Sequence, residues 1–130
     1  MTKKNYKKTC AIILCGGKGT RLGKKGLKKN KTLIKYKGFP LIYHILKYLN
    51  KFNINDIVIP YGYKGLPIKK YVNKKFNSKN IFCFDAGMNT SIIQRIKKSL
   101  KYIDTSCTNI LILNGDSYYN FDLKKVINNK

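Results

Sequence analysis

Short apolar runs and longer amphipathic segments alternate along the chain. The apolar runs cover Ala11–Leu14, Asp56–Ile59, Ile81–Phe84 and Ile110–Leu113. Runs of this length, almost free of polar residues, are typical of strands that are covered on both faces, as in a parallel sheet. We therefore predict four buried strands, the second of which ends at Pro60.

The segments between these runs repeat apolar residues at the spacing of a helix. Pro40 and Pro67 stand near the start of the first two segments, where proline suits the first helical turn. A further short helix is expected near Leu123. The apolar positions of the three longer segments are Leu41, Ile42, Ile45, Leu46 and Leu49; Ile68, Tyr71, Val72 and Phe76; and Ile92, Ile93, Ile96, Leu100 and Ile103.

This alternation of strands and helices predicts an α/β fold, a Rossmann-like three-layer α/β/α arrangement with a mainly parallel sheet. The chain has 130 residues, 43% of them hydrophobic, and we expect one domain over residues 10–130 after a basic tail over residues 1–9. Ligands of such sheets bind beyond the carboxyl ends of the strands. The loop after the first strand is therefore the first candidate for a site.

The chain is strongly basic, with a formal net charge of +23. Clustered lysines bind nucleic-acid phosphates, but here the lysines are spread along the whole chain and only Arg21 and Arg95 are arginines. Lys, Asn, Ile and Tyr all have A/T-rich codons, which accounts for much of the excess. The Tyr and Phe residues also fall mostly on predicted core faces or turns. We therefore predict a solvated lysine surface and do not expect nucleic acid as a partner.

The sequence also bears on location. Its apolar runs are too short for a membrane span, and the run after the basic start ends at CGG, too early for a signal peptide. The four cysteines form no C-x-x-C pair, so we expect free thiols in a reducing compartment rather than a zinc site or disulfides. We predict a cytoplasmic protein without membrane contact. The cysteines are Cys10, Cys15, Cys83 and Cys107.

The loop AIILCGGKGTRLG, residues 11–23, has the glycines and cations of a phosphate-binding loop. It does not fit a P-loop, because the spacing from Gly19 to Gly23 is one residue short and Lys24 is not followed by a hydroxyl residue. It fits a G-x-G-x-x-G dinucleotide fingerprint only loosely, because Leu22 occupies the third glycine position. A loosened G-x-G-x-x-x-G loop stays open, but it is a weak signal by itself.

Further motifs follow this loop in a fixed order. Lys31 and Leu33 stand in a segment that reads Asn30-Lys-Thr-Leu, and GFPLI then leads into the first helix. NINDIVIPYGYKG forms the second strand and its exit, and LILNGDSYYNFDL carries a Gly-Asp pair at the end of the fourth. Over about residues 11–123 this order resembles the sugar-1-phosphate nucleotidyltransferase family, although Asn30 replaces the family's proline. The resemblance implies the nucleotide-diphospho-sugar transferase version of the α/β fold.

The segment DAGMNT, followed by Arg95 and Lys97, is similar to a motif of glucose-1-phosphate cytidylyltransferases. Gly87 and Thr90 match that motif, whereas Ala86 replaces its threonine and IIQ replaces its Thr-Gly-Gly. The similarity gives CTP a slight preference as the nucleotide. The base and the sugar both stay open.

The resemblance implies transfer of a nucleotidyl group from an NTP to a sugar 1-phosphate, which gives pyrophosphate and a nucleotide-sugar of the kind used in polysaccharide biosynthesis. By resemblance the catalytic residues are Arg21, Lys31 and Asp116, and Asp116 binds Mg²⁺. Copies of the chain are expected to associate, as family members commonly do. The implied nucleotide-binding residues are Leu14, Cys15, Gly16, Gly17, Gly19, Thr20, Gly87, Thr90 and Arg95.

Several alternatives stay open. Asp116 could cap a turn, and Arg95 could be an ordinary exposed helix residue, whereas His44 is expected to be structural. Family members are longer, and their second half supplies most sugar contacts and a second metal-binding aspartate. We therefore expect the N-terminal half of such an enzyme, a truncated, fragmentary or degenerate copy with little activity by itself. The alternative function is a non-catalytic basic module that binds nucleotides or nucleic acid.

Overall fold

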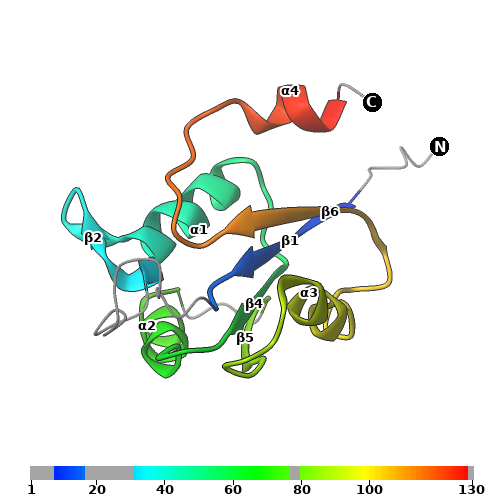
Figure 1. The fold of residues 1–130 in the computed structure, drawn as a ribbon. Helices are drawn as coiled ribbons and strands as arrows, with labels where there is room; N and C mark the ends of the chain where they lie inside the picture. Colours follow the sequence, from blue (N-terminus) through cyan, green and yellow to red (C-terminus); the bar gives the residue numbers. More distant parts are fainter. Residues whose placement is uncertain (1–7, 17–30, 77–79, 129–130) are drawn as a thin grey trace.

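Four parallel strands form the centre of the molecule. The computed structural model describes residues 8–16, 31–76 and 80–128. Strands β1 (Lys8–Leu14), β4 (Ile57–Tyr61), β5 (Ile81–Asp85) and β6 (Cys107–Asn114) pair in the order β5-β4-β1-β6 (Figure 1). Every pair in this sheet is parallel, which confirms the predicted α/β fold.

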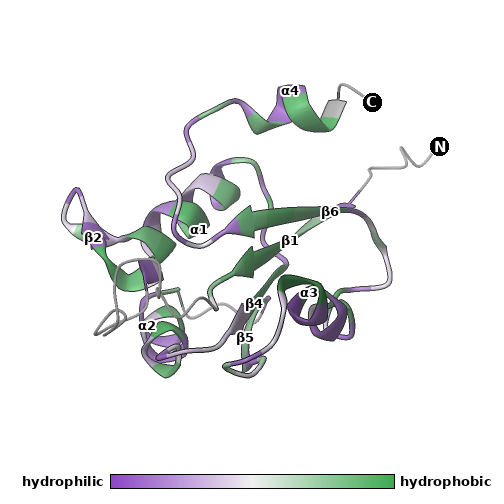
Figure 2. Ribbon diagram, viewed as in Figure 1, coloured by the Kyte–Doolittle hydropathy of each residue, from purple (hydrophilic) through white to green (hydrophobic). Residues whose placement is uncertain are grey.

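Helices cover both faces of the sheet. The main core joins one face of the strands to α1 (Leu41–Lys51), α2 (Leu66–Phe76) and α4 (Leu123–Asn128). Helix α3 (Ile92–Leu100) packs over β1 and β4. Because side chains alternate along a strand, the residues of β1 and β4 that lie outside the main core face α3, and the fold has three layers. Figure 2 shows β1 and β6 as hydrophobic strands and α3 as a helix with one strongly hydrophilic side.

A small hairpin precedes α1 and was not predicted. A 3-10 turn, η2 (Lys31–Leu33), leads into β2 (Lys35–Tyr36) and β3 (Phe39–Pro40), which pair antiparallel. Lys37 and Gly38 form the turn with φ of 49° and 83°, the positive values that a two-residue hairpin turn requires. Strands of two residues are too short to show an alternating pattern, so no periodic signal indicates them.

Strand β4 continues past its predicted end. Pro60 and Tyr61 belong to it, so the prediction that Pro60 closes the strand is wrong. Proline lacks only the N–H group, and the Pro60 carbonyl still accepts a hydrogen bond from the backbone N–H of Cys15 at 3.3 Å. The extension brings Tyr61 into the sheet, where it pairs with Cys15 at the carboxyl end of β1.

Helix α3 presents a different face from the predicted one. A capping box between Ser91 and Gln94 fixes its start. Arg95 and Ser99 are buried against the sheet, whereas Ile92 and Ile93 are 59% and 68% exposed. Helix α3 packs over β1 and β4, and its apolar residues Ile92, Ile93 and Leu100 stay exposed. We use the name α3–β6 face for the exposed apolar residues of α3 and β6 together, which are Ile92, Ile93, Leu100, Ile110 and Ile112.

Two of the four cysteines form a disulfide. Cys10 of β1 and Cys107 of β6 are bonded, with their Cα atoms 6.1 Å apart, so the prediction of free thiols is wrong for this pair. The two strands are neighbours, which brings together cysteines 97 positions apart in the sequence. Cys15 and Cys83 are buried thiols outside the disulfide, and burial raises the pKa of Cys83 to about 11. The expectation of a reducing compartment rested on four free thiols, and the disulfide removes that support.

No helix in the described ranges has the length and apolar character needed to cross a bilayer.

Candidate functional site

The carboxyl ends of β1, β4 and β6 meet at one edge of the sheet. Cys15, just after β1, pairs with Tyr61 at the end of β4. On the other side the backbone N–H of Gly115 donates to the carbonyl of Leu14 at 2.9 Å. Leu14, Cys15 and Gly16 therefore lie at the centre of the edge where ligands of α/β sheets bind.

Three glycines bring the loops at this edge into backbone contact. A Cβ atom on Gly62 would lie 2.9 Å from the Gly87 carbonyl oxygen and 3.6 Å from the Gly16 Cα. Gly87 also has φ of 98°, a conformation that favours glycine. The exits of β1, β4 and β5 are thus packed against each other without intervening side chains.

Arg95 reaches from α3 into this glycine cluster. Its guanidinium lies against Gly16, since a Cβ atom there would be 2.4 Å from the Arg95 Cζ. Nε of Arg95 donates to the Thr90 hydroxyl at 3.1 Å, and that hydroxyl donates to the Gly87 carbonyl at 2.9 Å. The structure therefore brings Gly16, Gly87, Thr90 and Arg95 together.

Arg95 is a buried cation. The residue is 8% exposed, which rules out the ordinary exposed helix position, and burial lowers the pKa of its guanidinium. Among the described residues no carboxylate forms an ion pair with it. A buried charge costs free energy unless an opposite charge or hydrogen-bond acceptors compensate it. The position therefore suits a ligand that presents phosphate oxygens or other acceptor atoms.

A second part of the site lies between β6 and the η2 turn. A Cβ atom on Gly115 would be 2.7 Å from the Cys15 Sγ and 2.8 Å from the Thr32 Oγ1, so this glycine is tightly enclosed. Thr32 is buried beside Lys31, and Asp116 follows Gly115 as an exposed residue. The η2 turn and the Gly-Asp loop thus pack together and place the backbones of Lys31 and Asp116 in the same region.

Two tyrosines hold the loop that carries Asp116. The hydroxyl of Tyr119 accepts from the Asn114 N–H at 2.9 Å and donates to the Asn114 carbonyl at 3.3 Å. The hydroxyl of Tyr48 on α1 donates to the Phe121 carbonyl at 2.7 Å. These bonds tie both ends of the loop to the core.

The thiol of Cys15 is unsuited to chemistry at neutral pH. Full burial raises its pKa to about 12, and a hydrogen bond from Thr32 only partly opposes that shift. A neutral thiol is a poor nucleophile and a poor metal ligand. Cys15 therefore contributes its backbone and its volume to the site.

The described residues offer few ligands for a metal. They contain no group of three or more His, Cys, Asp or Glu side chains that could together hold an ion. The exposed carboxylate of Asp116 is a hard oxygen ligand of the kind Mg²⁺ prefers. It fits one position of a coordination sphere that other oxygen ligands must complete.

Part of the predicted site lies outside the described residues: Gly17, Gly19, Thr20 and Arg21. Conversely, Gly62, Thr32 and Gly115 contribute to the site but were not predicted. Their neighbours in the sequence gave a hint, since Gly62 lies in the exit of the second strand, Thr32 beside Lys31 and Gly115 beside Asp116.

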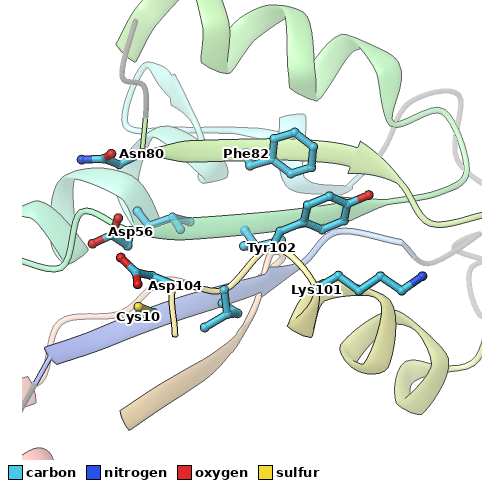
Figure 3. A pocket seen from close by; sticks show the side chains of 10 residues that line it. Cys10, Asp56, Asn80, Phe82, Lys101, Tyr102 and Asp104 are labelled. Atoms are coloured by element: carbon cyan, nitrogen blue, oxygen red, sulfur yellow. The ribbon is translucent and has the colours of Figure 1, made fainter. Parts of the chain in front are cut away.

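A cavity of about 210 Å³ opens at the opposite, amino-terminal edge of the sheet. Figure 3 shows Asp56 and Asp104 on one side of it and the rings of Phe82 and Tyr102 on another. Lys8 pairs with both carboxylates, at 3.1 and 2.8 Å, and its hydrogen bond lowers the pKa of Asp104 to about 2. These acidic residues are engaged with Lys8, far from Asp116.

Comparison with known proteins matches the whole described domain. The sequence profile of the nucleotidyl transferase family fits residues 10–130. The chain is 28% identical to glucose-1-phosphate cytidylyltransferase of Salmonella typhimurium, over 90% of this chain and 54% of the relative. It is 32% identical to D-glycero-alpha-D-manno-heptose 1-phosphate guanylyltransferase of Campylobacter jejuni, over 89% of this chain and 51% of the relative.

A solved structure shows the same arrangement. HddC from Yersinia pseudotuberculosis, in complex with GMP-PN, superposes with a TM-score of 0.77 at 28% identity, over 92% of this chain and 53% of HddC. The chain thus spans about half the length of these relatives. The match over residues 10–130 and the shared parallel sheet lead to one conclusion: this chain belongs to the nucleotidyl transferase family.

Proposed function

We propose that the protein takes part in nucleotidyl transfer from a nucleoside triphosphate to a sugar 1-phosphate. The observation that carries the proposal is the packing of the buried Arg95 on Gly16. This contact lies at the edge of the sheet where the Gly-Asp loop begins after β6. Both named relatives transfer a nucleotidyl group to a sugar 1-phosphate, which supports the same reaction class here. The chain spans about half of those relatives, so its part in the reaction is centred on the nucleotide.

In this reaction an oxygen of the sugar phosphate attacks the α-phosphorus of the NTP. A bond forms between that oxygen and the α-phosphorus, the bond to the bridging α–β oxygen breaks, and pyrophosphate leaves with the electron pair. The protein contributes by positioning the reactants and by offsetting negative charge on phosphate oxygens. Cationic side chains and backbone N–H groups are suited to both tasks.

The described residues divide these tasks. Gly16 lets the ligand approach the backbone closely, and Arg95 donates its remaining guanidinium hydrogens to acceptor atoms of the nucleotide. Lys31 supplies a point charge beside the Gly-Asp loop. Asp116 would hold Mg²⁺, which neutralises phosphate charge when bound. Arg21, outside the described residues, would bind the departing pyrophosphate by resemblance.

The nucleotide base is a finer part of the proposal. The DAGMNT segment gives CTP a slight preference, and the relatives include both a cytidylyltransferase and a guanylyltransferase. Cytosine and guanine both offer acceptor atoms that a guanidinium can bind, so Arg95 alone does not decide between them. We take CTP and GTP as the first nucleotides to test. A cytoplasmic location and association between copies stay predictions from the sequence.

Pyrophosphate release tests the reaction. The protein is incubated with Mg²⁺, each of the four NTPs and a panel of sugar 1-phosphates, alone and with the second half of the Salmonella relative added as a separate chain. Release that needs both substrates and is lost in Asp116→Ala and Lys31→Met supports the proposal. Release that is unchanged in both variants would refute the assigned roles. The matched control is Lys101→Met, a lysine at the opposite edge of the sheet.

A further inference from the structure

An aromatic surface lies on the β2–β3 hairpin and its surroundings. Tyr36 and Phe39 come from the hairpin, Tyr43 and His44 from α1, and Tyr118 from the loop after β6. The His44 ring lies at the centre, with centroid distances of 5.8, 6.2, 5.5 and 5.5 Å to Tyr36, Phe39, Tyr43 and Tyr118. We call these five rings the hairpin platform.

The outer rings of the hairpin platform are open to solvent. Tyr36, Phe39 and Tyr118 are 43%, 39% and 44% exposed, whereas the core residue Tyr48 is 9% exposed. The rings form two pairs, Tyr36 with Tyr118 at 4.9 Å and Phe39 with Tyr43 at 4.2 Å. Tyr36 and Phe39 flank the hairpin turn and Tyr118 lies in a loop, and the sequence did not predict that these rings would gather into one cluster.

Lysines stand directly over these rings. The ammonium of Lys37 lies 5.3 Å from the centroid of Tyr36 and 5.4 Å from that of Tyr118. Lys75 lies 5.8 and 5.9 Å from the centroids of Phe39 and Tyr43. Each ring pair therefore combines a flat π surface with a positive charge.

Another exposed aromatic group, around Tyr102, differs from the hairpin platform in its charge. Tyr102 contacts Phe82 and Phe84 at 4.3 and 4.8 Å and is 47% exposed, similar to Tyr36. It borders the cavity of Figure 3, where Asp56 and Asp104 lie, and in the described ranges no lysine stands over its ring. Of these two exposed groups in the described part of the chain, the hairpin platform has lysines over its rings and the Tyr102 group has none.

We propose that the hairpin platform binds single-stranded nucleic acid, with bases stacked on its exposed rings and phosphates held by Lys37 and Lys75. Unpaired bases present flat faces, and the backbone between them carries a regular negative charge, so aromatic rings interleaved with cations match both features. A duplex hides its base faces and would engage only the lysines. The net charge of +23 adds long-range attraction for any polyanion, so the rings must be tested separately from the charge.

The test compares how tightly three polyanions bind to the full chain in the absence of NTP and Mg²⁺. Each polyanion is fluorescently labelled or added as a competitor. The three are an oligothymidine of about 15 nucleotides, the duplex of the same length, and heparin, which has charge but no bases. Anisotropy is followed in increasing KCl. The wild-type protein is expected to bind the single strand more tightly than the duplex, although the duplex of the same length carries about twice as many phosphates.

Substitution of the rings separates stacking from charge. Tyr36→Leu/Tyr118→Leu is expected to weaken oligothymidine binding about ten-fold or more and to leave heparin binding unchanged. Tyr102→Leu, the matched control, is expected to change neither. Lys37→Gln should reduce the salt dependence of single-strand binding by about 0.7 in log–log slope.

Oligothymidine binding by the double tyrosine variant equal to that of wild type would overturn the proposal. An equal loss of oligothymidine and heparin binding would also overturn it, because the protein would then recognise charge alone. Thermal melting of each variant shows whether it is folded. Phe39→Leu, in the other ring pair, provides a second variant, and unchanged single-strand binding in a folded Phe39→Leu protein likewise counts against the proposal.

Discussion

Arg95 is the residue on which the candidate site depends most. It was predicted from a short motif in which two of the family's glycines are replaced, and the structure places it against Gly16 with Thr90 as its hydrogen-bond partner. Arg95, Gly16 and Thr90 could be predicted from the sequence because each stands in a motif. The sequence did not identify Gly62, Thr32 or Gly115, because their role is close packing between loops that are far apart along the chain.

Gly16→Ala is predicted to displace the Arg95 guanidinium. The added methyl group would lie 2.4 Å from the Arg95 Cζ, and the flexible arginine moves more easily than the backbone does. We expect nucleotide affinity to fall about ten-fold, because charged hydrogen bonds are lost, with little change in thermal stability. Isothermal titration calorimetry measures the affinity. Gly38→Ala is the control: it strains a positive φ in the hairpin and should leave affinity unchanged.

Asp104 is predicted to make part of the stability sensitive to acid. Lys8 holds the pKa of Asp104 at about 2, below its ordinary value of 3.8, so the pair stabilises the fold above about pH 4 and is lost as the pH falls towards 2. The melting temperature of wild type should therefore fall over this range more than that of Asp104→Asn. Equal pH profiles for the two proteins would show that the pair contributes nothing.

The strands and helices were predicted with different success. The four β strands and the helices at Leu41, Leu66 and Leu123 follow from apolar runs and helical spacing, because burial on a sheet or a helix face controls those patterns directly. The face of α3 was predicted wrongly, because a polar residue, Arg95, is buried for the site while apolar residues stay exposed. The β2–β3 hairpin was missed because its strands have two residues each.

The link between β1 and β6 gives a prediction for these elements. Reduction of Cys10–Cys107 should lower the free energy of unfolding by about 2–4 kcal/mol, because the bond closes a loop of 97 positions in the unfolded chain. Urea denaturation with and without dithiothreitol measures the change, and Cys10→Ala/Cys107→Ala should not respond to dithiothreitol. Thiol titration of the unfolded, unreduced protein should find two free thiols; four would contradict the disulfide.

At the scale of the whole molecule, one side of the sheet is incompletely covered. Ile110 and Ile112 are 42% and 49% exposed on β6, an edge strand, on the side of the sheet where α3 packs. An exposed apolar surface next to a free strand edge favours association. The sequence predicted these residues as apolar, but only the strand order shows that β6 lies at the edge.

Ile112→Lys is therefore predicted to reduce self-association of the chain at high concentration. Its effect on stability should stay within about 1 kcal/mol, because the side chain is half-exposed. Sedimentation velocity over a concentration series measures the association. Thr108→Lys adds the same charge at an exposed position of β6 outside the α3–β6 face and should have a smaller effect. Equal effects of the two variants would show that charge alone controls association.

NTP binding by the full chain at increasing salt shows most directly whether Arg95 and the glycine cluster form a nucleotide site. If Arg95 and the glycine cluster form a nucleotide site, one NTP binds more tightly than the other three, its preference persists as salt is raised, and Arg95→Met removes the preference while Lys101→Met keeps it. Binding that falls steeply with salt, equally for all four NTPs and in the same way for Arg95→Met, would contradict a nucleotide site and would support a merely basic surface.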